Sequence, residues 1–172
     1  MGILRRIQNK VPDAVLRNLY YTLVNPYFDY WNLIWAASPS GTLNKLFRLQ
    51  KRAIRVITKS KLNEHTSPLF INNDIFTIPK INQLQTGCFM YKVKNNLQPL
   101  YFVEMFQLNS DVHKYSTRQA DSYHIRSHRL TVTSHSIRIS GVKLWNNISN
   151  MLKNVETLNM FKTKFRHHLI NN

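Results

Sequence analysis

The sequence predicts a mainly α-helical fold: a small helical bundle followed by a less regular region with one candidate short β-hairpin and a C-terminal helix. Two observations carry this prediction. Apolar residues recur every three or four positions in several segments, most clearly between Thr42 and Lys59, as they do on the buried side of a helix. Of the 172 residues, 43% are hydrophobic and 12% are aromatic, which favours a packed core over a disordered basic tail.

The first part of the chain predicts two helices before a turn. A helix is expected from residue 12 to about residue 24, and the Asn-Pro pair at 25–26 ends it, because the residue before a proline avoids the helical region. The aromatic segment 27–35 predicts a second helix. Aromatic residues this dense favour core positions over a platform on which bases stack. The Ser-Pro-Ser-Gly sequence at 38–41 predicts the turn.

The segment 42–59 predicts one amphipathic helix with two different sides. The apolar side is formed by Leu43, Leu46, Phe47, Ala53, Ile54 and Ile57. Another side carries positive charges at steps of three and four residues, here called the basic stripe: Lys45, Arg48, Arg52, Arg55 and Lys59. A solvated surface usually interleaves acidic residues as ion-pair partners, but this segment contains no Asp or Glu. That absence favours a face that binds a polyanion.

The remaining elements are less regular. Helices are expected at about 66–72, 78–97, 142–148 and 155–169, with a short apolar helix or turn at 100–106. Two short stretches, 130–133 and 136–140, alternate apolar and polar residues, and they are the candidate strands of the β-hairpin.

Positive charge is concentrated at the two ends of the chain. The formal net charge is +16 and the pI is about 10.3, which for a folded protein points first to nucleic acid and second to an anionic membrane. Residues 1–60 hold ten Lys or Arg and two acids, residues 61–113 hold four of each, and residues 114–172 hold ten and two. We therefore expect three parts: a basic helical segment 1–62, a neutral packing segment 63–106 and a basic segment 107–172.

The residues that catalysis or metal binding requires are scattered. None of the eight acids is adjacent to another, so no pair of carboxylates is predicted to hold two metal ions. Asp29 is interpreted as a surface or capping residue, and the seven histidines as anion-facing side chains. With four glycines there is no phosphate-binding loop. We expect no catalytic residue, no metal site and no cofactor in this chain.

The location expected from the sequence is intracellular, either nuclear or cytoplasmic. The single cysteine, Cys88, lies in an apolar helical pattern and is expected to be a buried core thiol. No apolar run approaches the length of a transmembrane helix, and no signal sequence is evident.

Several stretches resemble the region after the palm in non-LTR retrotransposon reverse transcriptases of the jockey and LINE type. The most specific are the Gln-Lys-Arg-Ala sequence at 50–53 and the Gly-x-Lys-x-Trp-Asn sequence at 141–146. The others are residues 19–35, 46–58, 89–92, 97–99, 113–118, 136–140 and the terminal helix that contains Phe161 and Lys162. Together they cover nearly the whole chain.

The resemblance implies that the chain is a C-terminal piece of an RNA-directed DNA polymerase from a mobile element. Residues 1–62 would be the thumb and the rest the post-thumb region. The catalytic Asp-Asp turn and its Mg²⁺ belong to the palm, which would precede Met1, so Met1 is expected to be an internal methionine. The implied partner is an RNA/DNA template-primer, gripped through its backbone without regard to sequence by the basic stripe. Secondary candidates for contacts with nucleic acid are Tyr115, Arg118, Arg138 and Lys143.

Two other functions stay open at this level. The chain is alternatively a non-catalytic basic helical protein that docks an acidic partner or an anionic membrane, or a product that does not hold its fold without the palm. For Arg118 and Arg138, a scaffolding role through hydrogen bonds to backbone carbonyls is an equal alternative. No oligomeric state is predicted.

Overall fold

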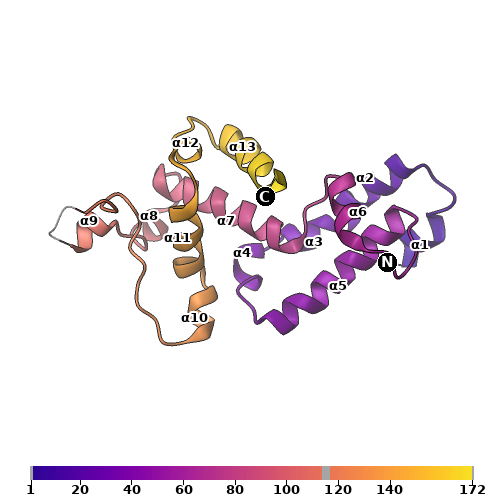
Figure 1. The fold of residues 1–172 in the computed structure, drawn as a ribbon, viewed down its shortest axis with the longest axis horizontal. Coiled ribbons are helices and arrows are strands. Elements are labelled where there is room, and N and C mark those ends of the chain that lie inside the picture. Colours follow the sequence, from indigo (N-terminus) through magenta and orange to yellow (C-terminus); the bar gives the residue numbers. More distant parts are fainter. Residues whose placement is uncertain (1, 114–116, 172) are drawn as a thin grey trace. The chain divides into compact units, whose positions relative to one another are not determined.

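A computed structural model describes residues 2–113 and 117–171, and these residues are mainly helical (Figure 1). The predicted fold class is confirmed. Within the described residues, the β-structure consists of one isolated antiparallel bridge between Leu108 and Tyr123. Contacts between Cα atoms divide the chain into two units, which are Met1–Asn32 with Ser38–Ile81 and Leu33–Ala37 with Asn82–Asn172. The expected segment 63–106 is thus shared between the two units.

The expected β-hairpin is wrong. Its two candidate strands lie in helices α10 (Thr131–His135) and α11 (Ile137–Asn147). The alternating pattern extends over only five residues, whereas Ile139, Val142 and Trp145 recur every three positions and are all buried. A stripe at this spacing is buried by a helix and not by a strand, so the helical period decides the structure of the segment.

The first unit is built from short helices around α5. Its helices are α1 (Gly2–Ile7), α2 (Asp13–Leu23), α3 (Asn25–Asp29), α5 (Ser40–Ile57), α6 (Thr66–Asn72) and the first turn of α7 (Ile78–Lys94). Its core consists of Leu16, Tyr20, Ala53, Ile54, Ile57, Phe70 and Ile75. Of the six apolar residues expected on α5, Ala53, Ile54 and Ile57 belong to this core and Phe47 packs against it.

The aromatic segment does not form the single buried helix that was expected. It is divided into α3 and the short α4 (Asn32–Trp35), and Trp31 between them has a φ of 52°. Phe28 is buried, but Tyr27, Tyr30 and Trp31 are 80%, 72% and 60% exposed. Phe28 is the buried residue of α3, and Asn32 is the buried residue of α4. The Asn32 side chain donates a hydrogen bond of 2.9 Å to the carbonyl of Phe28.

A buried glutamine joins three parts of the first unit. Gln50 on α5 is fully buried, and its Nε2 donates to the hydroxyl of Tyr20 at 3.1 Å and to the carbonyl of Phe76 at 2.8 Å. Its Oε1 accepts a hydrogen bond of 2.9 Å from the backbone N–H of Ile78. The first N–H groups of a helix lack an intrahelical partner, so Gln50 satisfies one at the start of α7. These bonds fix the rotation of α5 about its own axis.

Helix α5 ends at Ile57, two residues earlier than expected. The backbone N–H of Ser60 donates to the carbonyl of Arg55 at 2.9 Å, and that of Lys59 donates to the carbonyl of Val56 at 3.3 Å. This pair of bonds is a Schellman motif, in which the residue after the helix adopts a left-handed conformation. Lys59 holds that position with a φ of 54°, in place of the glycine that usually stands there. It therefore lies outside the helix.

The second unit surrounds an aromatic cluster. Its helices are most of α4, the rest of α7, α8 (Leu100–Val103), α9 (Asn109–Val112), α10, α11, α12 (Asn150–Lys153) and α13 (Leu158–Asn171). The ring of Phe161 is stacked on Tyr91 at 4.9 Å and on Phe165 at 5.3 Å, and it lies 5.8 Å from the ring of Trp145. The hydroxyl of Tyr91 donates to the carbonyl of Val155 at 2.7 Å, which ties α7 to the segment before α13.

Candidate nucleic-acid interface

The basic side of α5 lies opposite its buried side. At 3.6 residues per turn, the buried residues Gln50, Ala53, Ile54 and Ile57 occupy an arc of about 100°. The four basic-stripe residues that lie on the helix occupy an arc of about 80°, centred roughly opposite. They are Lys45, Arg48, Arg52 and Arg55. The packing that buries one side therefore points the other toward solvent, because Gln50 and the core set the rotation of the helix.

Three of these four residues are exposed and have no protein partner among the described residues. Lys45, Arg48 and Arg52 are exposed, and no hydrogen bond or ion pair is found for them in the described part of the chain. Helix α5 itself contains no acidic residue. An exposed cation that lacks an internal partner keeps its full charge available to an external anion.

Arg55 is engaged with the protein itself. Its Nε and Nη2 donate to the backbone carbonyl of Glu64 at 3.0 and 2.8 Å, and its side chain is half-buried. The carboxylate of Glu64 in turn accepts a hydrogen bond of 3.2 Å from the backbone N–H of Lys61. These contacts hold the loop after α5 against the helix. Arg55 thus shapes the interface and contributes its charge from a fixed position.

Lys59, the last residue of the basic stripe, is placed differently from the others. It follows the end of α5, and its Nζ forms an ion pair of 2.8 Å with the carboxylate of Asp13 at the start of α2. The sequence could not show this, because the pairing depends on how α2 packs against α5. The structure therefore brings together four of the five predicted residues on one helix face and leaves Lys59 beside the neighbouring helix.

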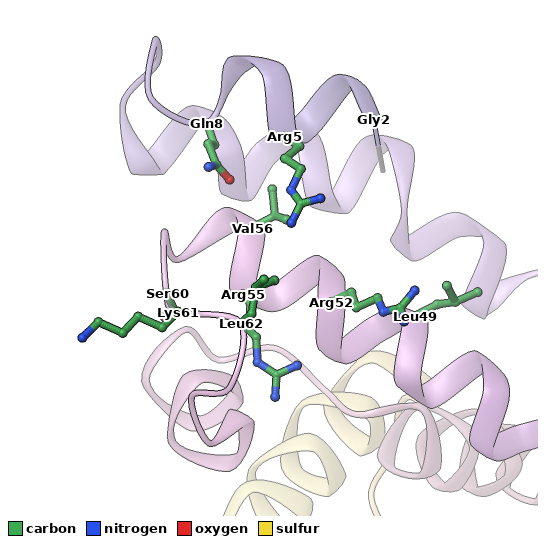
Figure 2. Close-up of a pocket in the computed structure, with 10 residues that line it drawn as sticks. All are labelled: Gly2, Arg5, Gln8, Leu49, Arg52, Arg55, Val56, Ser60, Lys61 and Leu62. Atoms are coloured by element: carbon green, nitrogen blue, oxygen red, sulfur yellow. The ribbon is translucent and has the colours of Figure 1, made fainter.

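A pocket of about 740 Å³ lies beside this face, between α1, α5 and the turn after α5 (Figure 2). Ten described residues line it: Gly2, Arg5, Gln8, Leu49, Arg52, Arg55, Val56, Ser60, Lys61 and Leu62. Four of them are basic and none is acidic. Sequence reasoning missed Arg5 and Lys61, because nothing in the periodicity indicates that α1 packs on α5.

The secondary candidates form no common site in the described residues. Tyr115 lies outside the residues that the structure describes. Arg118 is exposed in the segment between α9 and α10. Arg138 and Lys143 are both exposed on α11, but five residues apart they point about 140° away from each other.

The Gly-x-Lys-x-Trp-Asn sequence serves mainly to pack the second unit. Gly141 and Trp145 are buried, and a Cβ atom on Gly141 would lie 3.2 Å from the sulfur of Met90. The side chain of Asn146 binds both backbone groups of Tyr123: it accepts from the N–H at 3.2 Å and donates to the carbonyl at 2.9 Å. Three residues of the sequence are therefore explained by packing and hydrogen bonding.

The other residues singled out from the sequence have ordinary surroundings. Asp29 is exposed, and its carboxylate accepts a hydrogen bond from the side chain of Asn25. Cys88 was expected to be a buried core thiol, but it is a free thiol that is only half-buried. This partial burial raises its pKa. No group of three or more His, Cys, Asp or Glu side chains that could hold a metal ion occurs in the described residues. None of the described helices has both the length and the apolarity needed to cross a bilayer.

Comparisons of the chain with known protein families, with curated proteins and with solved structures found no match. The resemblance to non-LTR reverse transcriptases therefore stays a prediction, and it rests on the sequence alone.

Proposed function

We propose that this chain binds the backbone of nucleic acid without regard to sequence, as the thumb and post-thumb part of a reverse transcriptase from a mobile element. The observation that carries the proposal is the acid-free face of α5, where Lys45, Arg48 and Arg52 are exposed opposite a buried side. Basic side chains on one rigid helix neutralise phosphates and release their counterions, and they carry no information about base identity.

The dimensions of the face fit a polynucleotide strand. From Lys45 to Arg55 the helix rises roughly 15 Å at 1.5 Å per residue. Phosphates on one strand of B-form DNA follow each other every 3.4 Å or so along the axis, so this length spans several of them. We assign no catalytic role to the chain, because none of its eight acidic residues is adjacent to another. The implied Asp-Asp turn would belong to the palm of a longer protein.

The first prediction concerns the salt dependence of binding to an RNA–DNA hybrid. Changing the three exposed residues Lys45, Arg48 and Arg52 to Ala is expected to flatten the slope of log affinity against log salt by about two to three units, since each lost phosphate contact removes about 0.9 units. Fluorescence anisotropy with a labelled hybrid at four or more salt concentrations measures the slope.

The matched control removes three basic residues from the same unit but outside α5, by changing Arg6, Lys10 and Arg17 to Ala. It lowers the net charge equally and should change the slope much less. An equal slope in the wild-type chain and the α5 variant would refute the role of this face. Equal effects of the two variants would show that net charge alone drives binding.

We also propose a second candidate of a different class, a basic helical protein that docks an anionic membrane or an acidic partner. The specific observation behind it is that Leu49 and Leu62, 46% and 73% exposed, border the same basic surface. Apolar side chains next to cations are typical of surfaces that enter a headgroup layer. Flotation with anionic vesicles and hybrid binding at the same salt concentration separate the two proposals, because retention by vesicles alone would favour the membrane.

A further inference from the structure

The pocket between α1 and α5 gathers positive charge from three separate segments. Arg5 comes from α1, Arg52 and Arg55 come from α5, and Lys61 comes from the turn after α5. No ion pair or hydrogen bond to the side chains of Arg5, Arg52 or Lys61 is found among the described residues. Like charges around one hollow repel each other, and an anion placed between them removes that repulsion.

The orientation of the side chains distinguishes the four cations. Figure 2 shows Arg5 pointing from α1 toward Val56 on α5, and Arg52 extending along α5 toward Leu49. Arg55 points the other way, toward the loop where it binds the carbonyl of Glu64. Lys61 points outward from the rim in the same view. Arg5 and Arg52 are therefore the two arginines of the pocket whose guanidinium groups are exposed and not bound to the protein.

The rest of the lining is suited to a ligand that has an uncharged part beside its charged group. Val56 and Leu49 form an apolar surface beside the two arginines, and Gln8 and Ser60 add hydrogen-bonding side chains. The volume of about 740 Å³ falls within the range of about 300–1,000 Å³ typical of sites for small molecules and cofactors. A bare inorganic anion would leave most of this space unfilled, whereas a phosphate with its attached sugar uses both kinds of surface.

We propose that this pocket holds one sugar-phosphate unit of a polynucleotide strand, with Arg5 and Arg52 gripping the same phosphate. The guanidinium fork suits this task, because it gives two parallel N–H groups to phosphate oxygens. The proposal rests on the proposed nucleic-acid function and deepens it. It extends the interface from α5 onto α1. It also gives Arg5 a specific contact with the ligand, whereas the sequence indicates only that this end of the chain is basic.

A double-mutant cycle on the full chain tests whether the two arginines share a ligand. R5A and R52A are each expected to weaken binding of an RNA–DNA hybrid. The loss in the R5A/R52A variant should be smaller than the product of the two single losses by at least about threefold, because residues that bind the same group are coupled. Arg48 lies on the same helix but outside the pocket, so R5A/R48A serves as the matched control, and its two losses should multiply.

A second readout uses inorganic phosphate and the Nε–H signals of arginine in NMR. Arg5 and Arg52 are expected to shift together during the titration, while Arg17 on α2 should not move. R5K keeps the charge but removes the fork, so it should recover only part of the hybrid affinity. Far-UV circular dichroism confirms that each variant keeps its helices, and R5Q replaces R5A if the latter unfolds.

The outcomes separate this site from the proposed function. Coupled losses for R5A and R52A with multiplying losses for R5A and R48A would support the shared site. Hybrid binding that depends on Arg48 but not on Arg5 would overturn the site and leave the proposed function standing. Losses that multiply in both cycles would also overturn it. An effect of R5A confined to anionic vesicles would overturn the site alone, whereas absence of hybrid binding in the wild-type chain would overturn both.

Discussion

At the scale of single residues, a buried polar group explains the orientation of the basic face of α5. Gln50 lies in the Gln-Lys-Arg-Ala sequence, next to basic residues that face solvent. Its amide contacts Tyr20, Phe76 and the N–H of Ile78, and these contacts are made only if α5 has one rotation. That rotation turns Arg48 and Arg52 outward. A neutral, buried side chain therefore determines where the charges point.

Tyr20 makes this network sensitive to alkaline pH. Burial raises the pKa of its phenol to about 12 from the ordinary value of 10.0, an effect that the hydrogen bond from Gln50 opposes only in part. The folded state thus keeps the proton that the unfolded state loses above pH 10. The stability that this group contributes is fully present below pH 10 and is lost between about pH 10 and 12, by roughly 2–3 kcal/mol.

Urea unfolding of the wild-type chain and of Y20F over this pH range measures the loss. Both proteins lose stability as their lysines and exposed tyrosines titrate, so the expected effect is the difference between them. The free energy of unfolding should fall more steeply above pH 10 in the wild-type chain. Parallel curves for the two proteins would mean that Tyr20 ionises as easily in the folded state as in the unfolded one.

At the scale of elements, two features matter: how the helices end, and how closely α13 packs on α7. Three helices, α5, α6 and α7, end in Schellman motifs with Lys59, Asp74 and Asn96 at the left-handed position. The chain has only four glycines, and none of them stands at these three helix ends, where longer residues adopt the left-handed conformation instead. In the second unit a glycine is used for close packing: Gly87 on α7 has no Cβ atom, which leaves room for Phe165 of α13.

Lys59→Gly is expected to stabilise the first unit. A lysine in the left-handed region is strained, and glycine removes roughly 1 kcal/mol of that cost, which outweighs the loss of an exposed ion pair with Asp13. Denaturant unfolding measures the change. Asn96→Gly should give a smaller gain, because asparagine already tolerates this conformation. Destabilisation by Lys59→Gly would show that the ion pair matters more than the backbone strain.

Gly87→Ala is expected to destabilise the second unit by about 1–3 kcal/mol. A Cβ atom at this position would lie 2.5 Å from Cε1 of Phe165, a ring that is itself fully buried against Phe161. The ring cannot move without disturbing the aromatic cluster. Thermal unfolding followed by circular dichroism measures the effect, with Gly41→Ala as the control because no atom lies near its added methyl group. Equal stability of the two variants would contradict the close crossing.

At the scale of the whole molecule, charge dominates. A net charge of +16 on 172 residues makes the basic side chains repel one another in the folded state. The ion pair between Lys59 and Asp13, in the described part of the chain, offsets a small part of this charge. A polyanion that neutralises the excess would stabilise the folded chain by mass action, which links binding to stability.

The chain is therefore expected to gain thermal stability with salt. Raising NaCl from about 0.1 to about 1 M shortens the screening length from about 10 to about 3 Å, so that repulsion between distant lysines and arginines disappears. The melting temperature should rise in calorimetry. A variant with Arg6, Lys10 and Arg17 changed to Glu should show a smaller rise. A broad transition at every salt concentration would indicate instead that the chain does not hold its fold without further protein.

Local pattern predicts the helices well where they are long or bounded by strong signals. The helix 66–72 is reproduced as α6, and the long helices α5 and α7 are found within two and three residues of their expected ends. The two failures have different causes. The candidate hairpin was inferred from stretches of four and five residues, which fit either period, so that packing decides between helix and strand. The aromatic segment is largely helical as expected, but a left-handed residue, Trp31, divides it into two helices.

The sequence by itself determined the helical class, the excess of positive charge and the presence of an acid-free basic stripe, because these follow from composition and from the period of the α-helix. Tertiary structure decided which cations are available. It anchored Arg55 to the carbonyl of Glu64, paired Lys59 with Asp13 and brought Arg5 into the same pocket as Arg52. Such outcomes depend on contacts between residues 9 to about 50 positions apart, and no local periodicity encodes them.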